Sequence, residues 1–366
     1  MTQGIFHRGL RRRHVLGIGG LLALPPSYGA GAGITAPNPV TGTEESHAYR
    51  VRLDLRTPFT SGTGGTWQVF PSGPGSETFG RPITSPQGLR VLAGGTDPVT
   101  GEPAFVYTTG REDHGGDGLA DHIKWFALAN RTATTGYLGF DAFPGHVLTY
   151  EATLSARTYG TGRHPFGAAV QDPSDDLRLA AGAMNTADPE TNMVFDFFLT
   201  NRRLYAFYER LPSPGQDHVA FSYAVPVAGR SPDQRHRLAI SLDSSRGVVT
   251  WTADGRQVLR VNRIGLRPRD RQNLILDLGG TEEIVAPRQL ACGMGMFTLL
   301  DARRPGSAGP ALVRLSNGVT YYDPAYGEPR PQRFVDDESL PGNRLWGQGG
   351  EVTVTRFEVS STPATP

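Results

Sequence analysis

The sequence predicts an all-β protein built from short antiparallel strands. Glycine and proline are abundant, at 47 and 29 of 366 residues, and segments rich in Val, Thr, Tyr and Phe recur between them. Several of these segments alternate apolar and polar residues with a period of two, as half-buried strands do. No repeat of fixed period stands out, which disfavours solenoids and propellers.

The first 32 residues are predicted to be a signal peptide of the twin-arginine type. Arg12 and Arg13 precede a short apolar run, and Ala30-Gly31-Ala32 is a suitable cleavage site. The run from residue 15 to residue 24 is shorter than the roughly 20 residues that span a bilayer. We therefore expect a secreted or cell-envelope protein that is not membrane-spanning after cleavage, with a linker at 33–48, a single domain at 49–360 and a tail at 361–366.

Charge and cysteine content exclude several functions. The chain carries 36 basic and 35 acidic residues, and residues 1–32 contain four arginines and no acid. The part after residue 32 therefore has 32 basic and 35 acidic residues, a net charge of −3. No basic stripe remains for nucleic acid. With Cys292 as the single cysteine, no intramolecular disulfide can form.

Segments of turn-forming residues separate the predicted strands. In residues 146–158, Leu148, Tyr150, Ala152 and Leu154 share one face. Residues 235–265 predict a three-stranded meander whose second turn is Asp254-Gly255. Further strands are expected at 88–95, 102–110, 121–130, 273–280, 290–300, 311–316 and 351–360.

Two resemblances extend this prediction. The pattern W-x-x-DG-x-x-V at 251–258, together with "PFTSGTGGTWQVFPSG", "GLRVLAGG" and the final "VTVTRFEVS", resembles concanavalin-A-like jelly rolls of the legume-lectin and laminarinase-like type. That likeness implies a β-sandwich of two antiparallel sheets. "DDLRLAAGAM", "VFDFFLTN", "YAFYERLP" and "GMGMFTLLDA" resemble an uncharacterised exported family from high-GC bacteria. This second resemblance bears on the fold and does not indicate which function the protein has.

Residues 193–212, "MVFDFFLTNRRLYAFYERLP", contain the best candidate site. If residues 201 and 202 form a two-residue turn, Asp196 faces Phe207 and Phe198 faces Tyr205. Glu209 is then a diagonal neighbour of Asp196 on the same face. The opposite face carries only core residues: Phe195, Phe197, Leu199, Leu204, Ala206 and Tyr208.

Carboxylates beside aromatic rings suit a sugar site, with Phe198, Tyr205, Phe207 and Trp125 as candidate ligand-binding residues. Asp196 and Glu209 are the candidate catalytic pair of a retaining glycosidase. The laminarinase-like pattern E-x-D-x-E is incomplete, however, because Val194 and Phe198 stand where its outer acids would be. The structural alternative is that the two acids are paired with Arg203, Arg210 or Arg178.

Residues 111–125 hold a second candidate site. Asp113, His114, Asp117, Asp121 and His122 surround a Gly-rich loop, and such ligands suit Ca²⁺ or a transition metal. The spacing matches neither an EF-hand nor a zinc-protease helix, and a solvated turn is the alternative.

Three functions remain open at this point. The leading one is non-covalent binding of a polysaccharide or cell-envelope glycan. The second is a glycoside hydrolase or polysaccharide lyase that uses the carboxylate pair. The third is a structural cell-envelope protein that contacts another protein, since jelly rolls host all three.

Overall fold

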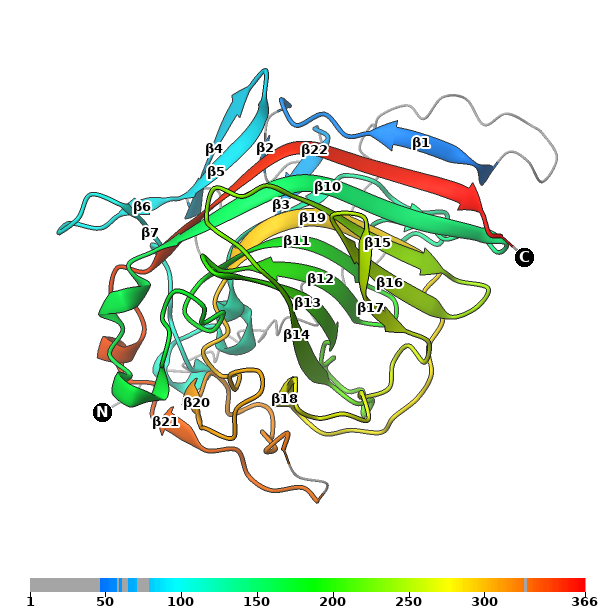
Figure 1. Ribbon diagram of the computed structural model, residues 1–366. Coiled ribbons are helices and arrows are strands. Elements are labelled where there is room, and N and C mark those ends of the chain that lie inside the picture. The colour runs from blue at the N-terminus through cyan, green and yellow to red at the C-terminus, as the bar shows by residue number, and fades with distance from the viewer. Residues whose placement is uncertain (1–46, 58, 61–64, 71–78, 326–327, 366) are drawn as a thin grey trace, which may run out of the picture.

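The computed structural model describes residues 47–365 except 58, 61–64, 71–78 and 326–327. The predicted signal peptide and nearly all of the linker lie outside the described residues. Two large sheets stack face to face, and both are antiparallel apart from one short parallel pair (Figure 1). No helix among the described residues has the length and apolarity needed to cross a membrane.

The outer sheet has eight strands. Its order is β17 (Arg256–Val261), β16 (Val248–Ala253), β15 (His236–Asp243), β10 (His146–Tyr159), β22 (Gly349–Pro363), β5 (Gly88–Ala93) and β4 (Gly80–Ser85), and β1 (Tyr49–Arg52) also pairs with β22. The predicted meander is confirmed as β15, β16 and β17, and its Asp254-Gly255 turn has φ values of 51° and 81°.

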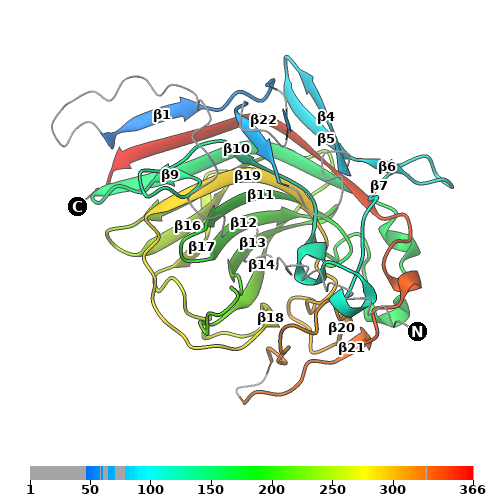
Figure 2. The ribbon, with the colours of Figure 1, turned by 180° about the vertical axis from the view of Figure 1, so that it is seen from behind.

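The inner sheet has ten strands. Its order is β18 (Leu274–Asp277), β14 (Phe221–Gly229), β13 (Arg203–Arg210), β12 (Met193–Leu199), β11 (Ala181–Asp188), β19 (Gln289–Phe297), β8 (Ile123–Ala129), β3 (Trp67–Val69) and β2 (Phe59–Thr60), and β9 (Phe140–Asp141) pairs with β19. The sheet is curved, and its concave face is turned away from the outer sheet (Figures 1 and 2).

Several short elements lie outside the two large sheets. They are β6 (Gly95–Thr96), β7 (Pro103–Ala104), β20 (Ala311–Val313), β21 (Phe334–Asp336) and 3₁₀ helices at Glu112–His114, Gly118–His122, Thr161–Arg163, Gly167–Ala169 and Pro341–Asn343. The hairpin of β6 and β7 contacts the outer-sheet strands β5 and β22. The strand expected at 102–110 is therefore mostly wrong, because only its residues 103 and 104 pair. In both ribbon views β20 and β21 lie on the concave side (Figure 2).

The predicted fold class, a concanavalin-A-like jelly-roll sandwich, is confirmed. The chain passes between the two sheets several times, and the last strand, β22, returns to pair with β1. The main core lies between the sheets and includes Leu148, Tyr150, Ala152 and Leu154, the four residues expected to share the buried face of β10. Burial of this apolar surface is the main source of stability in a chain without disulfides.

Candidate functional site

The hairpin of β12 and β13 has the predicted register. The Thr200 N–H donates to the Arg203 carbonyl at 3.0 Å, and this closes a two-residue turn. Asp196 lies opposite Phe207, and Glu209 lies opposite Val194, so both acids are on the concave face. The other face of the hairpin belongs to the core between the sheets, as predicted.

Aromatic rings from neighbouring strands surround the two acids. The Phe198 ring centroid is 4.6 Å from that of Phe207 and 5.3 Å from that of Phe297. Phe126 packs against Phe297 at 5.9 Å and against Phe70 at 5.6 Å. The concave face is therefore a second apolar layer, and an acid placed in it is desolvated.

A cavity of about 60 Å³ lies within this layer. Its polar lining comes from His122, Asn185, Asp196 and Glu209. Its apolar lining consists of Phe70, Ile123, Phe126, Ala187, Val194, Phe198, Phe207, Leu211, Phe297 and Leu299.

Asp196 is held by hydrogen bonds from β11. The ladder between β11 and β12 is interrupted here, and the Thr186 N–H donates to the Asp196 carboxylate at 2.8 Å while the Asn185 amide donates at 2.7 Å. From the outer sheet, the Trp251 indole N–H donates to the Asp196 carbonyl at 3.0 Å. Burial raises the pKa of Asp196 well above its usual value, although the hydrogen bonds from Thr186 and Asn185 oppose this and the charge of Glu209 adds to it.

Glu209 is partly exposed and accepts a hydrogen bond from the Ser222 hydroxyl. Burial raises the pKa of Glu209 to about 7, and the hydrogen bond from Ser222 works against this shift. Glu209 is therefore a carboxyl group whose charge changes near neutral pH.

His122 belongs to a buried hydrogen-bonded chain. Its Nε2 lies 2.6 Å from Asp301 Oδ1, and the Tyr321 hydroxyl donates to Asp301 Oδ2 at 2.9 Å. Burial opposes a charge on His122, but the Asp301 carboxylate outweighs this effect and raises the pKa of His122. The Asp301 side chain is completely buried, so this pair fixes the imidazole at the cavity wall.

Asn185 offers a hydrogen-bond acceptor without a partner. Its amide nitrogen donates to Asp196, whereas its Oδ1 is buried and accepts no hydrogen bond within the described part of the chain. Asn185 is 4% exposed and lines the cavity. Because an unsatisfied buried acceptor is costly, this atom marks a place where a ligand hydroxyl would be stabilised.

The predicted pairing of the two acids with Arg203, Arg210 or Arg178 is wrong. Arg203 pairs with Asp175 at 2.8 Å, Arg210 with Glu283 at 2.6 Å, and Arg178 with Asp176 at 2.6 Å. Each arginine thus has another carboxylate partner. The donors to Asp196 and Glu209 are uncharged.

The predicted metal site is not assembled. Asp113 pairs with Arg111 at 2.6 Å, and His114 also lies beside that guanidinium. Asp121 pairs with Lys124 at 3.2 Å, while Asp117 accepts a hydrogen bond from Tyr107. His122 is engaged by Asp301. Within the described ranges, no group of three or more His, Cys, Asp or Glu residues is placed to hold a metal ion.

Two of the predicted ligand-binding aromatics do not line the cavity. Trp125 is 1% exposed and packs between the sheets, where Gly80 lies against its ring. The β8 register places its side chain on the opposite face from Phe126. Tyr205 is on the concave face, but its hydroxyl donates to Asp175 at 3.0 Å and its ring is not part of the lining. Phe198 and Phe207 remain candidates.

Asn185 and Asp301 are not among the site residues that the sequence predicts. Asn185 lies directly across from Asp196 in register, so the strand "GAMNTAD" paired with the hairpin would have revealed it. Asp301 is 179 residues from His122, and no local pattern connects the two.

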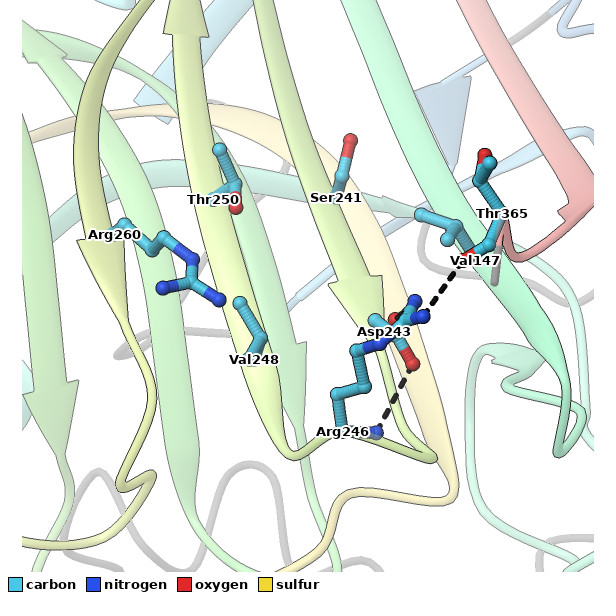
Figure 3. Close-up of a pocket in the computed structure, with 8 residues that line it drawn as sticks. All are labelled: Val147, Ser241, Asp243, Arg246, Val248, Thr250, Arg260 and Thr365. Atoms are coloured by element: carbon cyan, nitrogen blue, oxygen red, sulfur yellow. Dashed lines mark hydrogen bonds and ion pairs between the residues drawn. The ribbon is translucent and has the colours of Figure 1, made fainter.

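A larger hollow of about 390 Å³ lies on the outer sheet (Figure 3). Its Arg246 is paired with Asp243 at 2.8 Å and also donates to the Thr365 carbonyl at 2.6 Å. The described residues that line this hollow include no aromatic ring and no buried acceptor without a partner. The concave cavity is therefore the stronger candidate.

The fold and the site define a jelly-roll sandwich with an acidic, aromatic cavity on its concave face. A family of unknown function, DUF6081, matches residues 53–363, and the chain belongs to that family. One relative of this chain is uncharacterized protein L829 of Acanthamoeba polyphaga mimivirus. The two are 35% identical over a match that covers 37% of this chain and 44% of that protein. The match thus spans less than half of the relative.

Solved structures with a similar arrangement include three glycan-active proteins. The apo Crh5 transglycosylase is 12% identical with a TM-score of 0.36, and the match covers 87% of this chain and 85% of that chain. Alginate lyase A1-II′ of polysaccharide lyase family 7 is 10% identical with a TM-score of 0.36, and the match covers 77% of this chain and 84% of that chain. A Bacillus licheniformis β-glucanase is 8% identical with a TM-score of 0.36, and the match covers 86% of this chain and 97% of that chain. At these identities and TM-scores, function has to be argued from the site itself.

Proposed function

We propose that this protein binds a glycan non-covalently on the concave face of the inner sheet. The observation that carries the proposal is the buried Oδ1 of Asn185, a residue that lines the cavity; among the described residues this atom has no hydrogen-bond partner. Two carboxyl groups and the rings of Phe198 and Phe207 line the same cavity.

The cavity combines the two surfaces that a sugar requires. Aromatic rings pack against the apolar faces of a pyranose, and amide and carboxyl groups exchange hydrogen bonds with its hydroxyls. A volume of about 60 Å³ is far below the roughly 300–1,000 Å³ of pockets that enclose a whole small molecule. Only one group of the ligand enters the cavity, and the rest lies along the concave face.

The test is binding to an array of neutral and acidic glycans, followed by calorimetry on the hits. Ala187→Leu adds three carbons to the cavity lining and is expected to abolish binding, and Asp196→Asn is expected to weaken it. Thr250→Ala on the outer sheet is the control, and we expect it to bind like the wild type. Folding of each variant is checked by circular dichroism. The proposal fails if folded wild-type protein binds no glycan, or if Ala187→Leu binds as well as wild type.

A second candidate function is glycan cleavage. The observation that favours it is Glu209, whose pKa of about 7 suits a group that donates and accepts protons near neutral pH. His122, held by Asp301, lines the same cavity and is a second proton-transfer group. The test is the release of reducing ends or unsaturated products from the bound glycan, and Glu209→Gln should abolish it. Binding without product release would refute glycan cleavage and leave non-covalent glycan binding as the function.

We also propose that residues 1–32 direct export by the twin-arginine route. The support is the Arg12-Arg13 pair before a short apolar run. A reporter fused to residues 1–48 should be exported, and replacing both arginines by lysine should block export. Export that is unaffected by the double replacement would refute the route.

A further inference from the structure

We propose that the concave cavity selects a neutral sugar residue and rejects one whose entering group is a carboxylate, as in a uronic acid. This inference rests on the proposed glycan-binding function and names the class of ligand that the same site takes.

No unpaired cation faces the cavity. Among its described lining residues there is no arginine or lysine, and His122 is the single basic group. His122 is 2.6 Å from Asp301 Oδ1, so any charge on the imidazole is balanced by that carboxylate. A ligand carboxylate would therefore lose its water without gaining an ion pair, which is strongly unfavourable in an apolar site.

The cavity disfavours negative charge on the protein's own acids. Asp196 and Glu209 both line the cavity, and burial raises the pKa of both carboxyl groups. Since the site already resists the negative charge of its own side chains, it resists a ligand anion for the same reason. Ionisation of Glu209 at pH values above about 7 adds a like charge to the cavity lining.

A hydroxyl group, in contrast, finds both of the partners that it needs. Its hydrogen can be donated to the free Asn185 Oδ1, and its oxygen can accept from a protonated carboxyl of Asp196 or Glu209. The methylene carbon that carries a primary hydroxyl would contact Phe198 and Phe207. The small volume suits such an exocyclic hydroxymethyl group, which is where a hexose and its uronic acid differ.

The experiment compares matched ligands by calorimetry with the full chain. The probes are laminari-, cello- and manno-hexasaccharides and the same oligosaccharides with each C6 hydroxymethyl group oxidised to a carboxylate, at pH 5.5 and pH 8.5. We expect the neutral form of a bound oligosaccharide to bind at least about tenfold more tightly than its oxidised form, with a larger ratio at pH 8.5.

Glu209→Gln, which keeps the side-chain shape, should remove the pH dependence of that ratio. Thr250→Ala on the outer sheet should leave it unchanged. Equal affinity for neutral and oxidised forms at both pH values, or tighter binding of the oxidised form, would overturn the selectivity while leaving glycan binding intact. Failure of wild type to bind any member of the glycan array would remove the proposed function and this inference together.

Discussion

Replacing Asp196 by alanine should cost far more stability than replacing it by asparagine. The carboxylate accepts hydrogen bonds from the Thr186 N–H and the Asn185 amide, and all three side chains are at most 4% exposed. Alanine removes both acceptors and leaves two buried donors unsatisfied. Asparagine keeps an oxygen for Thr186, and a flip of the Asn185 amide turns its free Oδ1 toward the new NH₂ group.

The size of the difference follows from these contacts. An unsatisfied buried donor costs about 1–3 kcal/mol, so the two donors left by Asp196→Ala should lower the free energy of unfolding by about 2–6 kcal/mol. Asp196→Asn should lower it by less than about 1 kcal/mol. A carboxyl whose folded-state pKa is raised contributes less stability as the pH rises from its unfolded pKa toward the folded one. The asparagine variant should therefore gain stability relative to wild type as the pH rises.

The assay is urea unfolding followed by circular dichroism at pH 5 and pH 8 for the wild type and both variants. Similar losses for alanine and asparagine would refute the hydrogen-bond argument. A stability difference between asparagine and wild type that does not change with pH would refute the raised pKa.

Three further outcomes are expected. Stability should fall as the pH rises from about 4.5 to about 7, because the folded-state pKa of Glu209 is raised; unfolding at several pH values should show a smaller fall for Glu209→Gln. Trp125→Ala should lower the free energy of unfolding by about 3–5 kcal/mol without changing the glycan affinity of the folded fraction, and a large loss of affinity would contradict its place between the sheets. Cys292 is buried in apolar surroundings that raise the pKa of its thiol, so a thiol reagent should modify it only after unfolding; rapid reaction of the native protein would contradict this.

The hairpin of β12 and β13 shows which features of the site a local sequence pattern can predict. The two-residue turn and the alternation of side chains set which residues share a face, and these are properties of the backbone over a few residues. For this reason the placement of Asp196 beside Phe207 and of Glu209 on the same face was predictable. The same argument did not extend to Trp125, since choosing its face requires knowing which strand lies beside β8 and which sheet lies above it.

The sequence by itself determined the all-β class, most of the long strands and which residues of the β12–β13 hairpin share a face with Asp196 and Glu209. The reason is that side-chain alternation and turn formation depend on neighbouring residues. Only the tertiary structure decided what surrounds the acids. The pairing of His122 with Asp301 closes a separation of 179 residues, and the arginines near the hairpin in sequence are drawn to other carboxylates. Packing of distant segments over one sheet face, rather than any local motif, desolvates Asp196 and Glu209, raises their pKa values and leaves the Asn185 acceptor open.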